Sequence, residues 1–289
     1  MVKKCLFPAA GYGTRFLPAT KAVPKEMLPI LTKPLLQYAV EEALSAGISN
    51  MAIVTGRGKR SIEDHFDDSF ELESQLNGSS KERFLDDIKS VIQKSTFTYV
   101  RQRQMLGLGH AILTGEPLIG NEPFAVILAD DLCIDDDEIL LKKMIDIYNK
   151  YQCSVIAIED IELTEVDKYG VIAGDLMANE IDTYQVNNMI EKPSIRELSN
   201  YTETLISENK QPTFMGIIGR YILTPDIFDI LRNMKSVNGS EIQITDALSK
   251  QALEGKVLAY KFKGNRFDCG SVTGYVKATN YFADKQGLL

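Results

Sequence analysis

The sequence is poor in the residues that build metal clusters and redox centres. It has only two histidines, and its four cysteines, Cys5, Cys133, Cys153 and Cys269, form no C-x-x-C pair. A zinc site or a redox motif would need such pairs or a nearby cluster of histidines. Because disulfides are rare in the cytosol, we expect four reduced and partly buried thiols.

Long apolar segments are also missing. The apolar run after Lys3 and Lys4 is far too short for the hydrophobic region of a signal peptide. No stretch approaches the roughly 20 consecutive apolar residues that cross a bilayer. We therefore expect a cytoplasmic protein with no membrane partner.

Positive charge is in deficit. The chain has 32 Lys and Arg residues against 40 Asp and Glu residues, which gives a formal net charge of -8. Proteins that bind nucleic acid usually carry an excess of basic residues on one face. A small molecule is therefore the predicted partner, although a local basic pocket can coexist with an acidic surface.

Short runs with strand character alternate with amphipathic helical patterns through the first half of the chain. The runs are CLFPA, MAIVTG, FTYVRQ, PFAVILAD and CSVIAIE, which start at Cys5, Met51, Phe97, Pro123 and Cys153. Helices are predicted over Pro34 to Ala46 and around Leu140 to Tyr151, the second with the acids Asp136 to Glu138 in its first turn. This alternation predicts an α/β fold with a mixed, mostly parallel central sheet and helices on both faces.

Three later segments depart from this alternation. Residues 61–94 are predicted to form a helical excursion between strands, and residues 171–215 a small antiparallel subregion with turns at AGD, ANE and KPS. The chain ends in a predicted helix. Val272, Tyr275, Val276, Thr279 and Phe282 are expected to mark one face of this helix, which serves equally well as core or as a contact between subunits. With 289 residues and no linker, the chain is expected to form one domain with two lobes.

The segment AAGYGTR, from Ala9 to Arg15, follows the first predicted strand. Glycines let backbone N–H groups approach a phosphate closely. A Rossmann fingerprint would need a third glycine where Phe16 stands, and no Walker string G-x-x-x-x-G-K-[ST] occurs. Neither common phosphate loop is therefore present.

The loop that follows has its own pattern. Pro18, Pro24 and Pro29 are predicted to keep the chain extended rather than helical. The same loop brings Arg15 and Lys25 toward the glycines, which would give a polyphosphate two cations and several N–H donors. Taken alone, GYGTR is explained equally well by a tight turn with a surface arginine.

The continuation of this loop resembles the signature of the sugar-1-phosphate nucleotidyltransferases. The match begins with PAAGYGTRFLPATKAVPKEMLP and continues in order nearly to the end of the chain. The later motifs are VEEALSAGI, SIEDHFD, YVRQRQMLGLGHAIL, VILADD, KYGVIAGD, MIEKP, GIIGRYIL, GSEIQITDAL and FDCGSVTGY. The resemblance implies a Rossmann-like nucleotidyltransferase fold in a single domain, residues 1–289. A nucleotide-binding lobe is expected at about 1–135, a sugar-binding lobe at about 136–270 and a C-terminal helix at 271–289.

The resemblance also implies which residues bind the nucleotide. The substrate-binding positions that match in the loop are Ala9, Ala10, Gly11, Gly13 and Glu26. Arg15 and Lys25 match the residues on the phosphates. Gln102 matches the glutamine that reads the uracil edge, since a carboxamide offers both a donor and an acceptor, and Gly107 matches a backbone position against the base.

The sugar half follows from the later motifs. Gly170, Glu191, Lys192 and Gly216 match positions that bind the glucose hydroxyls and phosphate. A glutamate accepts two hydrogen bonds from neighbouring hydroxyls, and a lysine supplies a point charge for the phosphate. The plainer alternative is that Glu191 and Lys192 form an ordinary surface salt bridge.

Asp130 and Asp268 match the magnesium ligands of the family, so Mg²⁺ is the expected cofactor. The alternative is that Asp130 and Asp131 cap the next turn. Asp131 and the acids 135–137 are interpreted as residues at a helix start. His110 is expected to cap or pack at another helix start and His65 to lie on a surface helix, so neither histidine is predicted to be catalytic.

The implied reaction is attack by a phosphate oxygen of glucose 1-phosphate on the α-phosphorus of UTP, with Arg15, Lys25 and Lys192 as the catalytic cations. Enzymes of the same fold that use dTTP, CTP or ATP are the nearest alternative. A non-catalytic sensor of nucleotide sugars is a second, and Phe16 disfavours a third, a nicotinamide-dependent oxidoreductase. Because family members commonly form dimers or tetramers, we expect a homodimer or homotetramer.

Overall fold

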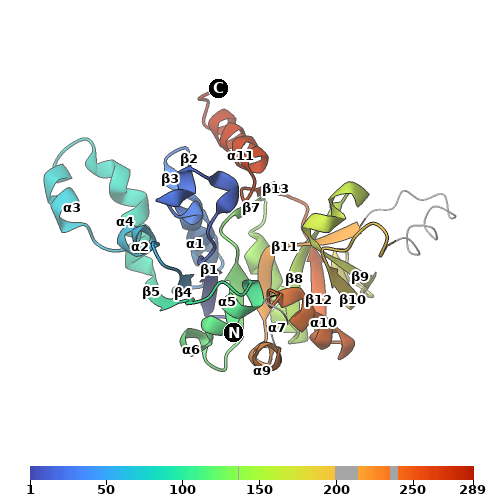
Figure 1. Ribbon diagram of the computed structural model, residues 1–289. Helices are drawn as coiled ribbons and strands as arrows, with labels where there is room; N and C mark the ends of the chain where they lie inside the picture. Colours follow the sequence, from blue (N-terminus) through green and yellow to red (C-terminus); the bar gives the residue numbers. More distant parts are fainter. Residues whose placement is uncertain (136, 199–213, 235–239) are drawn as a thin grey trace.

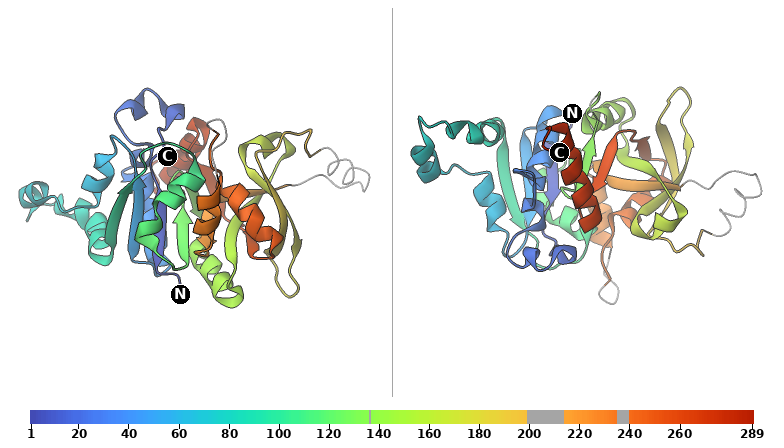
Figure 2. Two further views of the ribbon diagram at one scale, coloured as in Figure 1. Left: turned by 60° about the horizontal axis from the view of Figure 1, so that its bottom comes forward. Right: turned by 90° about the horizontal axis from the view of Figure 1, so that it is seen from above.

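The computed structural model describes residues 1–135, 137–198, 214–234 and 240–289 (Figure 1). Its centre is a nine-stranded sheet in the order β5-β4-β1-β6-β11-β8-β12-β10-β9. Helices lie on both sides of this sheet, as Figure 2 shows. Across the residues described, no helix has the length and apolar character needed to cross a membrane.

The first half of the sheet is parallel. Its strands are β1 (Lys4–Pro8), β4 (Asn50–Thr55), β5 (Thr96–Arg101) and β6 (Phe124–Ile127). β1 pairs in parallel with β4 and β6, and β4 pairs in parallel with β5. Each of these strands confirms a sequence prediction. Their carboxyl ends meet at one edge, where open α/β sheets bind ligands.

The second half of the sheet is mixed. Its strands are β8 (Ser154–Ile161), β9 (Gly170–Leu176), β10 (Thr183–Glu191), β11 (Phe214–Leu223) and β12 (Val257–Lys261). β11 runs antiparallel to β6, β8 and β9, and β10 runs antiparallel to β9 and β12, whereas β8 and β12 are parallel. The antiparallel subregion is confirmed. The parallel pairing expected for most of the sheet ends at β6 and recurs in this half between β8 and β12. The predicted AGD turn is wrong, because residues 173–175 lie inside β9 and pair with β10.

The two predicted lobes share this sheet. β6 belongs to the first and pairs directly with β11 of the second. Because one sheet spans both lobes, the strand pairing marks no boundary between them. The division at about residue 135 stays a prediction.

Two apolar layers cover the faces of the sheet. Because side chains alternate along a strand, the neighbours Leu6 and Phe7 enter opposite layers. One layer includes side chains of α1 (Leu35–Ser45), α2 (Arg60–His65), α4 (Asp86–Lys94) and α7 (Leu140–Tyr151). The other includes side chains of α5 (Leu108–Thr114), α6 (Glu116–Ile119), α9 (Ile227–Asn233) and α10 (Ile244–Leu253). Helices on both faces are thus confirmed.

The acids before α7 do not belong to its first turn, contrary to the prediction. α7 begins at Leu140, and Asp137 and Glu138 precede it, while Asp136 lies outside the described residues. The backbone of Ile139 is extended. This extended residue separates the acids from the helix N-terminus.

The loop after β1 is more compact than predicted. It forms short 3-10 turns, η1 (Thr14–Phe16), η2 (Ala19–Lys21) and η3 (Lys25–Met27), instead of an extended chain. Pro18 and Pro24 stand immediately before η2 and η3, where a fixed φ is compatible with the start of a turn. A small hairpin of β2 (Pro29–Ile30) and β3 (Lys33–Pro34) then leads into α1.

The helical excursion between β4 and β5 is confirmed. It contains α2, α3 (Phe70–Leu76), η4 (Glu82–Leu85) and α4. α3 projects away from the sheet, whereas α4 returns to it (Figure 1). The excursion therefore adds to one end of the molecule without interrupting the strand order.

The C-terminal helix, α11 (Val272–Lys285), contacts β2 and β13 (Asn265–Asp268). β13 pairs antiparallel with β7 (Asp131–Ile134). The C-terminal helix is confirmed, and its predicted face is buried only in part. Tyr275 and Phe282 pack on a small apolar cluster with the buried Ala278, but Val272 and Val276 are half exposed. The two aromatic rings fix the rotation of the helix and leave these valines on the solvent side.

A buried ion pair joins α1 to the sheet. Arg220 on β11 is 1% exposed, and its Nη2 lies 2.7 Å from the Glu42 carboxylate, while its Nε lies 3.0 Å from both oxygens of that group. Nη1 donates to the carbonyl oxygens of Leu128 and Gly219. These contacts give the guanidinium partners in a region where an unpaired charge would be strongly destabilising.

We expect Arg220→Gln to lower the free energy of unfolding by about 3 to 5 kcal/mol, because the Glu42 carboxylate stays buried without its partner. Glu42→Leu combined with Arg220→Met should recover most of this loss, since apolar residues of similar volume replace buried ion pairs at little cost. Urea unfolding followed by circular dichroism measures both. An equal loss in the single and the double variant would contradict this account.

Candidate active site

One cavity collects most of the residues that the sequence assigns to the sugar, the phosphates and the metal. Its volume is about 890 Å³, and residues from β7, β8, β11 and β13 and from the starts of α10 and α11 contribute to its lining. The predicted residues in the lining are Arg15, Asp130, Gly170, Glu191, Lys192 and Asp268. Residues that are far apart in the sequence thus share one space.

Asp130 and Asp268 approach each other around Gly270. The pairing of β13 with β7 places Asp268 opposite Asp131, the residue after Asp130. A methyl group on Gly270 would lie 2.9 Å from a carboxylate oxygen of each predicted metal ligand. The Gly270 N–H donates to Asp268 over 3.0 Å, and Arg15 Nη1 donates to the Gly270 carbonyl oxygen over 3.4 Å. One predicted cation and both predicted metal ligands therefore meet at one glycine.

Lys25 pairs with Asp130. Its Nζ lies 2.6 Å from Asp130 Oδ2, and about a quarter of each side chain is exposed. Burial acts to lower the pKa of Lys25, but the negative charges of Asp130 and Glu26 and the hydrogen bond to Asp130 together raise that pKa above its ordinary value. Burial acts in turn to raise the pKa of Asp130, but Lys25 holds it below its ordinary value. Both groups are therefore charged at neutral pH.

The two aspartates fit a magnesium ion. Mg²⁺ prefers hard oxygen ligands and is usually bound through one or two carboxylates plus substrate phosphates. Among the residues that the structure describes, no group of three or more His, Cys, Asp or Glu side chains surrounds a metal position. Protein side chains would thus supply only part of the ligand set. Burial and the nearby charge of Asp131 raise the pKa of Asp268, and a bound cation would oppose that shift.

Glu191 and Lys192 lie in the cavity wall at the end of β10. Glu191 Oε2 accepts a hydrogen bond from Thr245 Oγ1 over 2.6 Å. Gly170 lies opposite Glu191, and a methyl group there would lie 3.2 Å from Oε2 and 3.0 Å from the Thr245 hydroxyl. Lys192 is half exposed, and its Nζ lies 3.5 Å from Glu191 Oε1. The pair is thus a salt bridge, as the plainer alternative has it, but one that lines the cavity.

Gly216 is not among the described residues that line this cavity, although its neighbours Ile217 and Ile218 are. In β11 it pairs with Glu159 and with Val171. A methyl group on Gly216 would lie 2.9 Å from the Ile161 side chain. Close packing explains the glycine, and its contact with a sugar stays a prediction.

The predicted nucleotide loop packs against Lys25. Ala9 and Ala10 are buried and Gly11 is exposed. Gly13 has a left-handed backbone with φ 66°, and a methyl group there would lie 2.9 Å from Lys25 Cβ. The glycine therefore allows the loop and the lysine to form one unit.

Glu26 forms a buried ion pair with Lys59, which the sequence did not indicate. Lys59 Nζ lies 2.6 Å from Glu26 Oε2, while Glu26 Oε1 has no hydrogen-bond partner among the residues that the structure describes. Burial raises the pKa of Glu26 and lowers that of Lys59.

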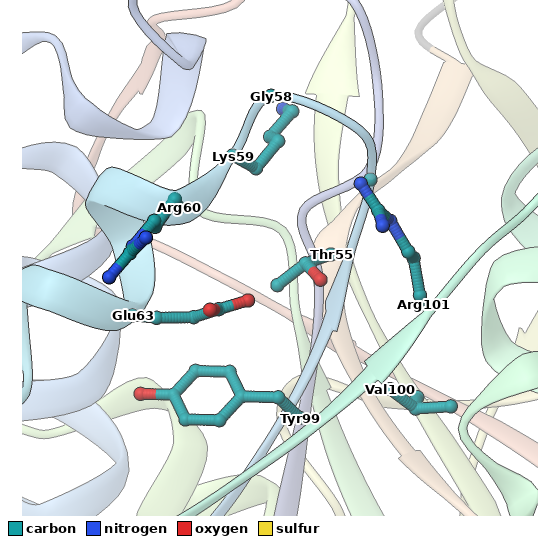
Figure 3. Close-up of a pocket in the computed structure, with 9 residues that line it drawn as sticks. Thr55, Gly58, Lys59, Arg60, Glu63, Tyr99, Val100 and Arg101 are labelled. Carbon is teal, nitrogen blue, oxygen red and sulfur yellow. The ribbon is translucent and has the colours of Figure 1, made fainter.

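Lys59 also lines a second depression of about 350 Å³, in which Arg60 and Arg101 lie on either side of Thr55 (Figure 3). The described lining of this depression includes no residue of the predicted site.

Gln102 follows β5 and is held by two contacts. Its Nε2 lies 2.8 Å from His110 Nδ1 and 3.4 Å from the Gly107 carbonyl oxygen. Burial lowers the pKa of His110, which favours the neutral ring that can accept this bond. Gly107 has φ 95°, and a methyl group on it would lie 2.9 Å from the Ile242 carbonyl oxygen. His110 thus orients the glutamine that the sequence assigns to the base.

The interpretation of Asp131 as a helix-start acid is wrong. Asp131 begins β7 and is 7% exposed. Its Oδ2 accepts the N–H of Gly219 over 2.7 Å, and its Oδ1 accepts Nε of Arg266 over 2.6 Å. Arg266 also donates to Glu159. A second aspartate after an apolar run is equally common in solvated turns, so its spacing could not reveal these contacts.

Comparisons with known proteins agree with this geometry. Residues 6–285 match the nucleotidyl transferase family. The chain is 59% identical over 282 residues to a UTP–glucose-1-phosphate uridylyltransferase from Pseudomonas aeruginosa, and the match covers 97% of this chain and 96% of that protein.

Solved structures extend the similarity to three dimensions. The crystal structure of an apo UDP-glucose pyrophosphorylase is 58% identical with a TM-score of 0.90 and covers 99% of this chain and 100% of its own. A UDP-glucose pyrophosphorylase complexed with UDP-glucose is 56% identical with a TM-score of 0.85 and the same coverage. The sheet described above is therefore the nucleotidyltransferase fold, and the chain belongs to the nucleotidyl transferase family.

Proposed function

We propose that this chain transfers the uridylyl group of UTP to glucose 1-phosphate and so produces UDP-glucose and pyrophosphate. The observation that carries the proposal is the single cavity in which Arg15, Asp130 and Asp268 meet Glu191 and Lys192. The relative with 59% identity is named for this reaction, and a similar solved structure is a complex with UDP-glucose.

The nucleophile in this reaction is a phosphate oxygen of glucose 1-phosphate. A phosphate monoester has a second pKa of about 6, so the oxygen is already an anion at neutral pH and needs no general base. The difficulty lies in bringing two anions together in line and in stabilising the charge that gathers on the leaving pyrophosphate. Cations and alignment, rather than proton transfer, are what the site has to supply.

At the nucleotide end, Arg15 and Lys25 are proposed to contact the phosphates of UTP. The pairing of Lys25 with Asp130 supports this, because it keeps a charged ammonium beside the carboxylates. Gln102 is proposed to read the uracil edge in the orientation that His110 maintains. The remaining substrate-binding residues proposed for this end are Ala9, Ala10, Gly11, Gly13, Glu26 and Gly107.

At the sugar end, Glu191 is proposed to accept hydrogen bonds from the glucose hydroxyls, and Lys192 to bind the phosphate. Gly170 leaves the wall beside the Glu191 carboxylate open, which supports this assignment. Gly216 is proposed to contact the sugar through its backbone.

Mg²⁺ is the proposed cofactor, with Asp130 and Asp268 as its protein ligands. When bound, the ion would supply positive charge beside the reacting phosphates. The converging carboxylates around Gly270 support this proposal.

A cytoplasmic location and a homodimer or homotetramer are also proposed, and the cavity itself is formed within one chain.

Pyrophosphate release from UTP, dTTP, CTP and ATP, each with glucose 1-phosphate or galactose 1-phosphate, tests the proposal directly. We expect the highest kcat/KM for UTP with glucose 1-phosphate and a strict requirement for Mg²⁺. Faster turnover of dTTP or CTP would favour a related transferase instead. Tight binding of UDP-glucose without any pyrophosphate release would favour a non-catalytic sensor.

We expect Lys25→Ala to lower kcat by a factor on the order of 10² to 10³, the cost of removing one group that stabilises transition-state charge. Lys33→Ala is the matched control, because Lys33 pairs with Glu41 over 2.8 Å at similar exposure, whereas only the partner of Lys25, Asp130, is among the residues that line the cavity. Steady-state rates and melting temperatures of both variants separate catalysis from folding. Equal losses of rate in the two variants would count against a catalytic Lys25.

We expect Gly270→Ala to reduce kcat roughly 100-fold, since displacing reacting groups by about 1 Å has effects of this size. The added methyl group would lie within 2.9 Å of both aspartates and would have to push them apart. The Mg²⁺ concentration for half-maximal rate should rise in parallel. A variant with wild-type rate and Mg²⁺ dependence would show that the aspartates need not meet here.

A further inference from the structure

We infer that Arg266 is a positioning residue that connects the metal-binding end of the cavity to its sugar-phosphate end and thereby sets where glucose 1-phosphate binds. This inference rests on the proposed function. Arg266 lies on β13, two residues before Asp268, and lines the cavity with only 9% of its side chain exposed. None of the motifs discussed above assigns it a role.

Arg266 holds three segments that the chain supplies separately. Its Nε donates to Asp131 of β7 over 2.6 Å, and its Nη1 donates to Glu159 of β8. Nη1 also donates to the hydroxyl of Tyr169 over 3.1 Å, and the guanidinium lies 5.0 Å from the centroid of that ring. A guanidinium can hold such partners together because its donors point in fixed, diverging directions, which a lysine ammonium does not provide.

The Asp131 contact fixes the metal-binding end. Asp131 stands opposite Asp268 in the β7–β13 pair, and its second oxygen accepts the N–H of Gly219 in β11 over 2.7 Å. Both oxygens of Asp131 are therefore engaged by protein groups. This ties the small β7–β13 sheet to the main sheet next to Asp130, which precedes Asp131, and to Asp268, which stands opposite it.

The Tyr169 contact fixes the sugar-phosphate end. The Tyr169 carbonyl oxygen accepts the backbone N–H of Lys192 over 2.9 Å, and the next residue, Gly170, pairs with Glu191. Lys192 has a left-handed backbone with φ 45°. Such a conformation persists in a non-glycine residue only when its surroundings hold it. Arg266 helps to maintain this conformation, because it binds the hydroxyl of Tyr169, whose carbonyl oxygen accepts the Lys192 N–H.

Charge strengthens the same argument. The acids in the cavity lining are Asp130, Asp131, Glu159, Glu165, Glu191, Glu241 and Asp268. Arg266 pairs with Asp131 and Glu159. Without it, both carboxylates would face an incoming phosphate dianion without a bonded cation. The loss should therefore weaken binding of glucose 1-phosphate and UDP-glucose more than binding of UTP, whose proposed contacts come from the glycine loop and from Gln102.

The test compares Arg266→Gln and Arg266→Lys with the wild-type chain. We expect Arg266→Gln to raise the KM for glucose 1-phosphate on the order of 100-fold, the scale of a displacement of about 1 Å. Calorimetric titration should show weaker binding of UDP-glucose and nearly unchanged binding of UTP. Arg266→Lys should recover only a small part of this loss, because lysine restores the charge without holding three partners. Wild-type KM in either variant would overturn the inference.

Arg220→Gln is the matched control, since it breaks another buried arginine–carboxylate pair at a residue that does not line the cavity. If Arg220→Gln raises the KM for glucose 1-phosphate as much as Arg266→Gln does, general destabilisation explains both effects and the inference is overturned. If Arg266→Gln does not fold, Tyr169→Phe removes only the acceptor hydroxyl. It should raise the KM for glucose 1-phosphate severalfold, and an unchanged KM would contradict the inference.

Failure of the proposed function would look different. In that case the wild-type chain would release no pyrophosphate from UTP and glucose 1-phosphate. The titrations with UDP-glucose and UTP would still decide the role of Arg266, because they need no turnover. Equal affinity of wild type and Arg266→Gln for UDP-glucose would then overturn the inference on its own.

Discussion

Repulsion between negative charges is the constraint on which the rest of this site depends. The proposed substrates both carry phosphates, yet the cavity that would receive them is lined by many carboxylates. The fold manages this by giving acids of the lining a bonded cation, and those cations come from separate segments of the chain. The pairs are Lys25 with Asp130, Lys192 with Glu191, and Arg266 with Asp131 and Glu159. The paired cations therefore offset the repulsion between these carboxylates and the phosphates, so the cavity can contain acids that bind a metal and a sugar and still admit anionic substrates.

The sheet supplies the frame that makes these pairs possible. β6 ends beside the loop that carries Lys25, and the short β7 that follows pairs with β13 from the far end of the chain. That pairing brings Asp268 next to Asp131, and Gly270 leaves just enough room for the aspartates to approach. β9 and β10, in the mixed half, bring Gly170 and Glu191 into the lining of the same cavity. The parallel half and the mixed half of the sheet thus both supply residues to one site.

Much of this arrangement could be predicted from the sequence, and the limits of prediction have a common cause. Strands such as β1 and β6 are apolar runs bounded by turn residues, so local pattern suffices to find them. Motif matching placed Asp130, Asp268 and Lys192 in one site, and the structure brings them to one cavity. It overlooked Asp131 and Arg266, because a contact between residues 135 positions apart leaves no local signal. The sequence likewise leaves open that Val272 and Val276 on α11 are half exposed, since aromatic packing from distant segments decides which side of the helix is buried.

The choice between lysine and arginine follows the same logic of charge. Arg220 and Arg266 are at least nine-tenths buried, and each bonds several groups at once, so neither can leave its partners without a cost in stability. Lys25 and Lys192 are more exposed, and each contacts a single carboxylate through a flexible stem. A lysine ammonium can therefore exchange a carboxylate for a phosphate when a substrate arrives, at the cost of one contact. In the proposed reaction, Arg266 keeps the geometry of the cavity wall constant, while Lys25 contacts the phosphates of UTP and Lys192 binds the phosphate of the sugar.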